Sequence, residues 1–192
     1  MAYTDWIPVL EILQDKKETS ILEFGIGAGT KALVDNFGEV FSLEILNDSE
    51  WFDKTVDQLK GYKNYRAKYI HAPELFVAHD EFTKSEQPNH RGNNFQAERP
   101  AKLLLDILEE SKGSIDYGKY DGFFVDAGVY LRGEIVNFVL RYKPRFVLVH
   151  DTNGFDDYGY NLVTSSEYAY FGFNTGDGTG LFLRKEKLIT NE

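Results

Sequence analysis

Short apolar runs alternate with amphipathic stretches along most of the chain. The runs that we interpret as strands cover residues 21–24, 40–43, 69–71, 120–126 and 145–151. Apolar residues recur every three to four positions between them, which predicts helices over residues 30–36, 51–59, 100–111 and 131–142. Near-continuous apolar strands that alternate with helices are typical of a parallel sheet covered on both faces.

The two ends of the chain follow other patterns. An apolar stripe between Asp5 and Gln14 predicts a leading helix that packs Trp6 against the sheet, with Pro8 tolerated in its first turn. Residues 168–173 and 180–184 flank a polar, glycine-containing turn, which predicts a C-terminal hairpin. One domain over residues 1–192 accounts for all of these elements.

Residues 73–99 break the alternation because charged and amide side chains dominate there. Ordinary connections run about 4 to 6 residues, so we interpret this segment as a substrate-covering lid or a mobile insertion. His79, Asp80 and His90 match no metal-binding spacing, and we expect them to be solvated loop residues.

A glycine-rich turn follows the first predicted strand. Gly25, Gly27 and Gly29 lie between that strand and a helix, and Glu44 ends the second strand nineteen positions after Gly25. Glycines let a ligand lie against the backbone and the first helical N–H groups, and a strand-end acid can accept hydrogen bonds from a ribose. Glu23 stands where it would repel a pyrophosphate and attract a cation. The turn thus predicts an adenosine-containing, positively charged cofactor.

The run from Glu23 to Gly29 resembles the E/D-x-G-x-G-x-G signature of class I S-adenosylmethionine-dependent methyltransferases. The resemblance implies a Rossmann-like, doubly wound α/β fold, with a mostly parallel seven-stranded sheet and an antiparallel C-terminal hairpin. It also implies that Glu23, Gly25, Gly27 and Gly29 bind S-adenosylmethionine, together with Glu44 and Asp126. In that family, residues just past the third strand contact the adenine, which corresponds to His71 or Ala72.

Further acids end the fourth and fifth strands, at Asp126 and Asp151, and His150 precedes the latter. Neighbouring strands lie about 4.8 Å apart, so two carboxylates there favour a cation between them. The pair, with Asn153, resembles the Mg²⁺ site of divalent-dependent O-methyltransferases, although the amide stands one residue later than in the catechol type. Asp126, His150 and Asp151 are the candidate catalytic residues: His150 is either a base that deprotonates a hydroxyl or a histidine that only hydrogen-bonds Asp151.

The amino-acid composition limits which methyl acceptors and which cellular compartment we expect. The formal charge is −10, from 21 Lys and Arg against 31 Asp and Glu, which argues against a nucleic-acid partner. Neither a membrane span nor a leader pattern stands out, and cysteine is absent, so we expect a cytoplasmic protein without disulfides. We predict methyl transfer to the hydroxyl oxygen of a small molecule, while the oligomeric state stays open.

Three alternatives share the glycine turn. A non-catalytic module could bind the adenosyl cofactor as a sensor, and a polyamine synthase would use the same cofactor in another reaction. An NAD-dependent oxidoreductase is disfavoured by Glu23 and because Thr30 occupies the place of the third glycine in G-x-G-x-x-G.

Overall fold

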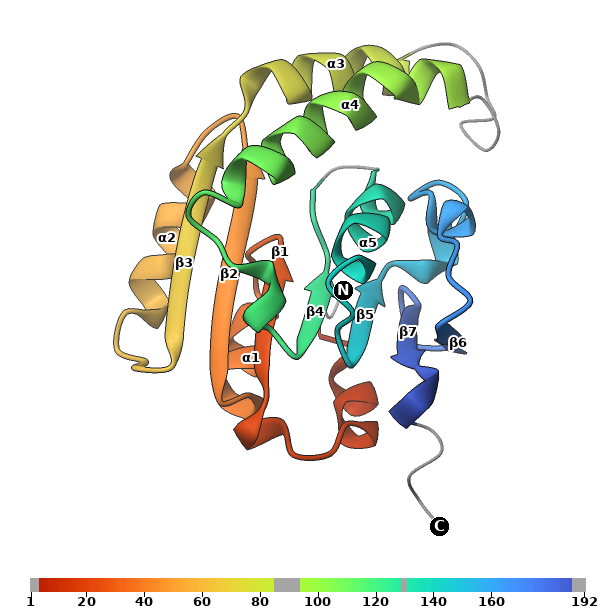
Figure 1. Cartoon of the computed structure of the whole chain (residues 1–192). Coiled ribbons are helices and arrows are strands. Elements are labelled where there is room, and N and C mark those ends of the chain that lie inside the picture. The colour runs from red at the N-terminus through yellow and green to blue at the C-terminus, as the bar shows by residue number, and fades with distance from the viewer. Residues whose placement is uncertain (1–3, 85–93, 129–130, 188–192) are drawn as a thin grey trace.

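Seven strands form a single sheet in the order β3-β2-β1-β4-β5-β7-β6 in a computed structural model of the chain (Figure 1). The structure describes residues 4–84, 94–128 and 131–187. The strands are β1 Ser20–Phe24, β2 Glu39–Leu46, β3 Tyr65–His71, β4 Gly122–Val125, β5 Phe146–His150, β6 Tyr168–Phe173 and β7 Thr179–Arg184. The first five are parallel, and β7 pairs antiparallel with both β5 and β6, which confirms the predicted fold class.

Helices connect the parallel strands and cover the sheet. The α-helices are α1 Thr30–Asn36, α2 Glu50–Leu59, α3 Pro73–Lys84, α4 Asn94–Ser111 and α5 Arg132–Leu140. Short 3-10 helices are η1 Ile7–Ile12, η2 Lys16–Glu18, η3 Tyr117–Lys119, η4 Thr152–Gly154, η5 Tyr160–Leu162 and η6 Lys185–Lys187. Among the described helices, none is both long and apolar enough to cross a bilayer.

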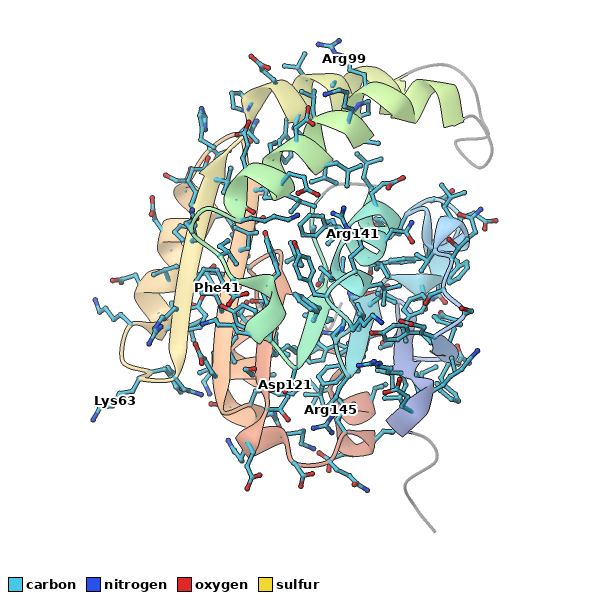
Figure 2. The ribbon with its side chains drawn as sticks, viewed as in Figure 1. Phe41, Lys63, Arg99, Asp121, Arg141 and Arg145 are labelled. Atoms are coloured by element: carbon cyan, nitrogen blue, oxygen red, sulfur yellow. The ribbon has the colours of Figure 1, made fainter. Side chains whose placement is uncertain are left out.

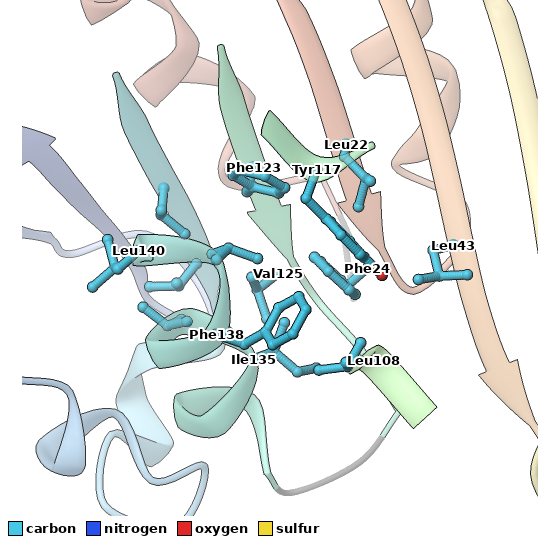
Figure 3. Packing of buried hydrophobic residues seen from close by; sticks show 14 of the residues in the cluster. Leu22, Phe24, Leu43, Leu108, Tyr117, Phe123, Val125, Ile135, Phe138 and Leu140 are labelled. Carbon is cyan, nitrogen blue, oxygen red and sulfur yellow. The ribbon is translucent and has the colours of Figure 1, made fainter. Parts of the chain in front are cut away.

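Two hydrophobic cores lie on the two faces of the sheet. On one face, buried residues of α4 and α5 such as Leu108 and Phe138 pack against Phe24 and Val125 of the central strands (Figure 3). On the other, η1 and α1 bury Leu10 and other apolar residues. Both faces of β1 and β4 are therefore buried, which explains why their sequences are almost continuously apolar and do not alternate between apolar and polar residues.

The amino ends of the central strands are joined by hydrogen bonds. Asp121 Oδ2 accepts from the backbone N–H of Ser20 at 2.8 Å, and its carbonyl accepts from the N–H of Arg145 at 2.7 Å. Figure 2 shows Asp121 and Arg145 at the end of the sheet away from α3 and α4. The acids at the opposite, carboxyl ends of the strands remain for ligand chemistry, as is usual in open α/β sheets.

Within the segment 73–99, which the sequence led us to interpret as a lid or mobile insertion, the described residues 73–84 and 94–99 are helical. Figure 1 shows α3 and α4 side by side beyond the carboxyl ends of β2 and β3. Mutual packing of two helices stabilises stretches whose periodicity is weak in the sequence, because tertiary burial outweighs local pattern. His90 lies outside the described residues, and a covering role for this segment stays a prediction.

Two predicted boundaries were also wrong. α4 begins at Asn94, so Pro100 lies inside the helix instead of opening it. The leading helix is the short 3-10 helix η1, which contains Pro8. A proline supplies no N–H, and 3-10 turns are tolerated in short pieces where an α-helix is not sustained. The expected burial of Trp6 is confirmed, since its side chain is 0% exposed and packs on Phe124.

Candidate active site

A cavity of about 730 Å³ opens at the carboxyl ends of β1, β4 and β5. Its first wall is the turn from Gly25 to Gly29, together with Glu23 and Trp51. Its second wall carries Asp126, Arg132, His150 and Asp151. The rim is completed by Asn153, Gly154, Asp157, Tyr158 and Asp177. A cavity of this size and place suits a small ligand or cofactor.

The glycines of the turn have distinct roles. Gly25 has a φ of +92° and packs so closely on the end of β4 that a Cβ there would lie 2.3 Å from the Asp126 carbonyl oxygen. A Cβ at Gly29 would lie 2.7 Å from the Trp6 ring. At Gly27 a Cβ would meet nothing within 4 Å. Gly25 and Gly29 thus permit close packing, whereas Gly27 keeps the backbone bare on the cavity side.

Glu23 is a buried acid in the wall of this cavity. It is 1% exposed, and its two oxygens accept hydrogen bonds from the hydroxyls of Thr30 and Ser42. Burial raises the pKa of Glu23 to about 8, despite those two hydrogen bonds. The carboxyl group is therefore largely protonated at neutral pH, and a cation bound beside it would favour the charged form.

Glu44 accepts a hydrogen bond from the backbone of the glycine turn. Its Oε2 accepts from the backbone N–H of Ile26 at 2.7 Å, and Oε1 accepts from its own neighbour Ile45 at 3.2 Å. Burial raises the pKa of Glu44 to about 7. β2 continues to Leu46, so Glu44 does not end the strand as expected, and it is not among the residues that line the cavity. Its role as the ribose acceptor stays a prediction.

Trp51 lies on the other side of the same turn. Its indole Nε1 donates to the carbonyl of Ile26 at 2.7 Å, and 48% of the residue is exposed. The ring lines the cavity, whereas His71 and Ala72, the expected adenine contacts, do not. An indole fixed at the edge of a cavity offers a flat apolar surface on which an aromatic base can stack.

Arg132 lies between the two acids that were expected to share a cation. Its Nη1 is 3.0 Å from Asp126 Oδ1 and 2.8 Å from Asp151 Oδ2. Its Nε donates to the carbonyl of Ala127 at 2.7 Å, and its guanidinium stacks on Tyr158 at 4.1 Å from the ring centre. Burial opposes the charge, but Tyr160, Asp126 and Asp151 outweigh it and raise the pKa of Arg132. A guanidinium thus supplies the positive charge at this position.

His150 is bound by carboxylates on both ring nitrogens. Nε2 lies 2.7 Å from Asp5 Oδ1, while Nδ1 lies 3.4 Å from Asp126 Oδ1 and 3.3 Å from Asp151 Oδ1. Burial alone would lower the pKa of His150, but Asp126, Asp5 and Asp151 raise it to about 9. The ring is therefore an imidazolium at neutral pH, with no lone pair to accept a proton.

Asp151 has a strained backbone, with φ of 58° and ψ of 40° in the left-handed region. Left-handed backbone at a residue other than glycine costs of order 1–3 kcal/mol and concentrates at functional sites. The conformation follows the last residue of β5 directly, and the side chain is about a quarter exposed in the cavity wall. Asp151 is thus held between Arg132 and His150 with part of its surface available to a ligand.

The acids and His150 also form two groups that could ligate a metal. Within each group the potential ligand atoms lie within 4.8 Å of one another: Asp126, His150 and Asp151, and Asp5, His150 and Asp177. The expected Mg²⁺ set of Asp126, Asp151 and Asn153 does not fit an ion, because Arg132 already bridges the carboxylates. In addition, the Asn153 amide donates to the carbonyl of Gly176 at 3.0 Å.

Several residues of the site were not identified from the sequence. Asp5 was expected only at the start of the leading helix and Trp51 at the start of the next predicted helix but one, and Arg132, Asp157 and Tyr158 had no assigned role. Trp51 carried one signal, because it is a large aromatic residue near the start of a helix that soon follows the second predicted strand. Arg132 carried none, since an arginine at a helix start is usually solvated. The side chains of His79 and Asp80 lie outside the described part of the chain.

Fold and cavity together define a Rossmann-like protein with a cavity at the carboxyl ends of its strands. No protein-family model matches the sequence, and no curated protein is similar to it at a significant level. Solved structures do match. An O-methyltransferase from Bacillus cereus in complex with SAH is 12% identical, over 94% of this chain and 80% of that one, with a TM-score of 0.57.

Two further structures match over nearly the whole chain. Fibrillarin from Aeropyrum pernix, with bound S-adenosyl-L-methionine, is 10% identical over 93% of this chain and 72% of its own, with a TM-score of 0.57. A methyltransferase from Geobacter sulfurreducens is 12% identical over 96% of this chain and 80% of its own, with a TM-score of 0.53. The chain therefore has the fold of class I S-adenosylmethionine-dependent methyltransferases, as its glycine turn had indicated.

Proposed function

We propose that the protein is an S-adenosylmethionine-dependent methyltransferase that acts on a hydroxyl oxygen of a small molecule. The observation that carries the proposal is that Glu23 and the bare backbone at Gly27 line the same cavity as Asp126 and Asp151, the acids that follow β4 and β5. A buried acid beside a glycine turn favours a cationic ligand over a pyrophosphate. This distinguishes the sulfonium cofactor from NAD.

The cofactor would lie along the first wall. The backbone of the turn from Gly25 to Gly29 would contact the cofactor, and the Trp51 ring would stack on its adenine. Glu44 would accept from the ribose through lone pairs left free by Ile26 and Ile45. Asp126 would complete the donor pocket opposite the turn.

The acceptor would enter from the rim formed by Asn153, Asp157 and Tyr158. We assign the proton-accepting role to Asp151, because its carboxylate lines the cavity and is partly exposed there, next to Arg132 and His150. The acceptor oxygen forms a bond to the methyl carbon as the carbon–sulfur bond breaks, and the hydroxyl proton moves to Asp151. His150 then orients the carboxylates instead of acting as the base.

Charge and cavity size favour a small acceptor. The chain carries a formal charge of −10, and the rim adds the acids Asp157 and Asp177. A polyanion such as a nucleic acid would be repelled from this opening. Small hydroxylated metabolites are therefore the acceptors to test first.

Binding and turnover are tested separately. Calorimetry with S-adenosylmethionine and with NAD should show binding of the first and none of the second; the reverse result would overturn the cofactor assignment. A mass-spectrometric screen of hydroxylated metabolites with methyl-labelled cofactor should then yield a product whose labelled methyl group is on oxygen. Cofactor binding without any labelled product, and with Asp151→Asn indistinguishable from wild type, would favour the non-catalytic module instead.

The identity of the base is tested by the pH profile. If Asp151 accepts the proton, kcat should be level from pH 6 to pH 8. If His150 were the base, kcat should rise with pH toward the His150 pKa of about 9.

A further inference from the structure

A guanidinium of the chain itself lies between Asp126 and Asp151 in the cavity wall. The Arg132 Nη1 lies within 3.0 Å of one carboxylate and 2.8 Å of the other, and it also donates to the carbonyl of His150 at 3.3 Å. Magnesium would need these same oxygens at about 2.0–2.1 Å. An ion and the guanidinium cannot occupy this space together.

Arg132 is also fixed in place. It is the first residue of α5, its Nε is held by the carbonyl of Ala127 at 2.7 Å, and the ring of Tyr158 covers its guanidinium. Because Nε, Nη1 and the face of the guanidinium are all in contact with neighbours, a change of the Arg132 rotamer would break these contacts. Binding a metal would require all of these contacts to break.

The surrounding charges add to the exclusion. His150 Nδ1 lies 3.4 Å from Asp126 Oδ1, the same oxygen that contacts Arg132, and 3.3 Å from Asp151 Oδ1, the other oxygen of that carboxylate. The carboxylate oxygens that a divalent ion would need are therefore already contacted by the Arg132 guanidinium and by the His150 ring. A divalent ion would enter next to the guanidinium and would be repelled by it.

We propose that Arg132 is a built-in replacement for a divalent cation: it holds Asp126 and Asp151 together, keeps the wild-type site free of metal, and leaves a latent metal site if removed. Arg132 is a positioning residue in this scheme, because it acts on the acceptor through Asp151. The inference rests on the proposed function for its catalytic consequence only. Exclusion of metal is a property of the folded site whether or not methyl transfer occurs.

The test is Mn²⁺ binding to the full chain, measured by electron paramagnetic resonance and by thermal denaturation. Wild type should bind no Mn²⁺ at this site. Arg132→Ala removes the guanidinium and leaves the two carboxylates without it, so it should bind Mn²⁺ at least ~10-fold more tightly than wild type. Its midpoint of unfolding should rise with Mn²⁺ concentration, since a ligand of the folded state stabilises it.

Two control variants distinguish replacement of the Arg132 guanidinium by Mn²⁺ from an effect of the lost side-chain packing. Arg132→Lys keeps a positive charge and should bind no Mn²⁺. Arg132→Ala combined with Asp151→Asn has the same space but one carboxylate fewer, and it should lose the Mn²⁺ binding gained by Arg132→Ala. Chelation by EDTA should leave wild-type turnover unchanged.

Several outcomes would overturn the proposal. Wild-type Mn²⁺ binding that Asp151→Asn abolishes would show that the arginine does not exclude metal. An Arg132→Ala protein that binds no Mn²⁺, or that stays unfolded at every Mn²⁺ concentration, would show that the two cations are not interchangeable. None of these results depends on methyl transfer, so a failure of the proposed function remains distinguishable.

Discussion

His150 Nε2 donates to Asp5 Oδ1 at 2.7 Å, which joins the end of β5 to the segment before η1 across 145 positions of the sequence. Asp5 Oδ2 in turn accepts from the backbone N–H of Asp177 at 2.7 Å. Burial acts in the opposite direction, but these hydrogen bonds lower the pKa of Asp5 and keep it ionised. Through Asp5, residues from both ends of the chain are thus joined to His150 in the cavity wall.

This pair makes stability depend on pH. The pKa of His150 is about 9 in the folded protein and about 6.5 in an unfolded chain, so its stabilisation is complete below about pH 6.5. It is lost as pH rises through about 9. We expect the free energy of unfolding to fall by up to about 3 kcal/mol over this range from His150 alone.

Chemical denaturation at several pH values measures the effect. The raised pKa values of Glu23 and Glu44 act in the same direction, because both acids bind more protons when folded. The His150→Gln variant should show a weaker pH dependence than wild type between pH 6.5 and 9. An equally steep profile would contradict the charged state of His150.

Substitutions at Gly27 and Gly29 should have opposite effects. Gly27→Ala should change stability by no more than about 0.5 kcal/mol, because its Cβ meets no neighbour, but it should weaken cofactor binding by filling the bare surface. Gly29→Ala should destabilise the fold by roughly 1–3 kcal/mol, because its Cβ would clash with Trp6. Thermal unfolding and calorimetry with S-adenosylmethionine measure the two effects, and unchanged affinity in Gly27→Ala would count against the placement of the cofactor.

Cofactor binding should release a proton through Glu23. The pKa of Glu23 is about 8 without ligand, so the acid is mostly neutral at pH 7 and must ionise to pair with a cation. Calorimetry in buffers of different ionisation enthalpy should detect close to one proton released at pH 7. In Glu23→Gln the release should disappear, while both hydrogen bonds to Thr30 and Ser42 retain an amide partner. Equal proton release by the variant and wild type would exclude Glu23 as the source.

Trp51 should report cofactor binding directly. The chain has two tryptophans, and Trp6 is fully buried while Trp51 is 48% exposed at the cavity. Stacking of an adenine on Trp51 should quench its emission, and Trp51→Ala should weaken binding by roughly 1–3 kcal/mol. Trp51→Phe keeps a ring for stacking but removes the indole, so it should retain most affinity without the quenching. A wild-type signal that persists in Trp51→Phe would assign it to Trp6 instead.

The sequence by itself determined the order of the elements and the place of the site. Continuous apolar runs report strands buried on both faces, and a glycine turn between strand and helix reports a backbone that must approach something closely. The acids at Asp126 and Asp151 follow their strands directly, so parallel pairing alone brings them together. These features involve residues that are close together in the sequence, so they can be recognised without knowledge of the fold.

Only the tertiary structure decided which partners these groups have. The helix over residues 100–111 was predicted, but α3 and the start of α4 before Pro100 were not, because their mutual packing leaves no clear short-range period. Asp5 meets His150 from the far end of the chain, and Arg132 turns inward to take the place that a metal was expected to fill. The direction of a side chain depends on what folds around it, and the charge that neutralises a buried acid can come from any part of the chain that reaches it.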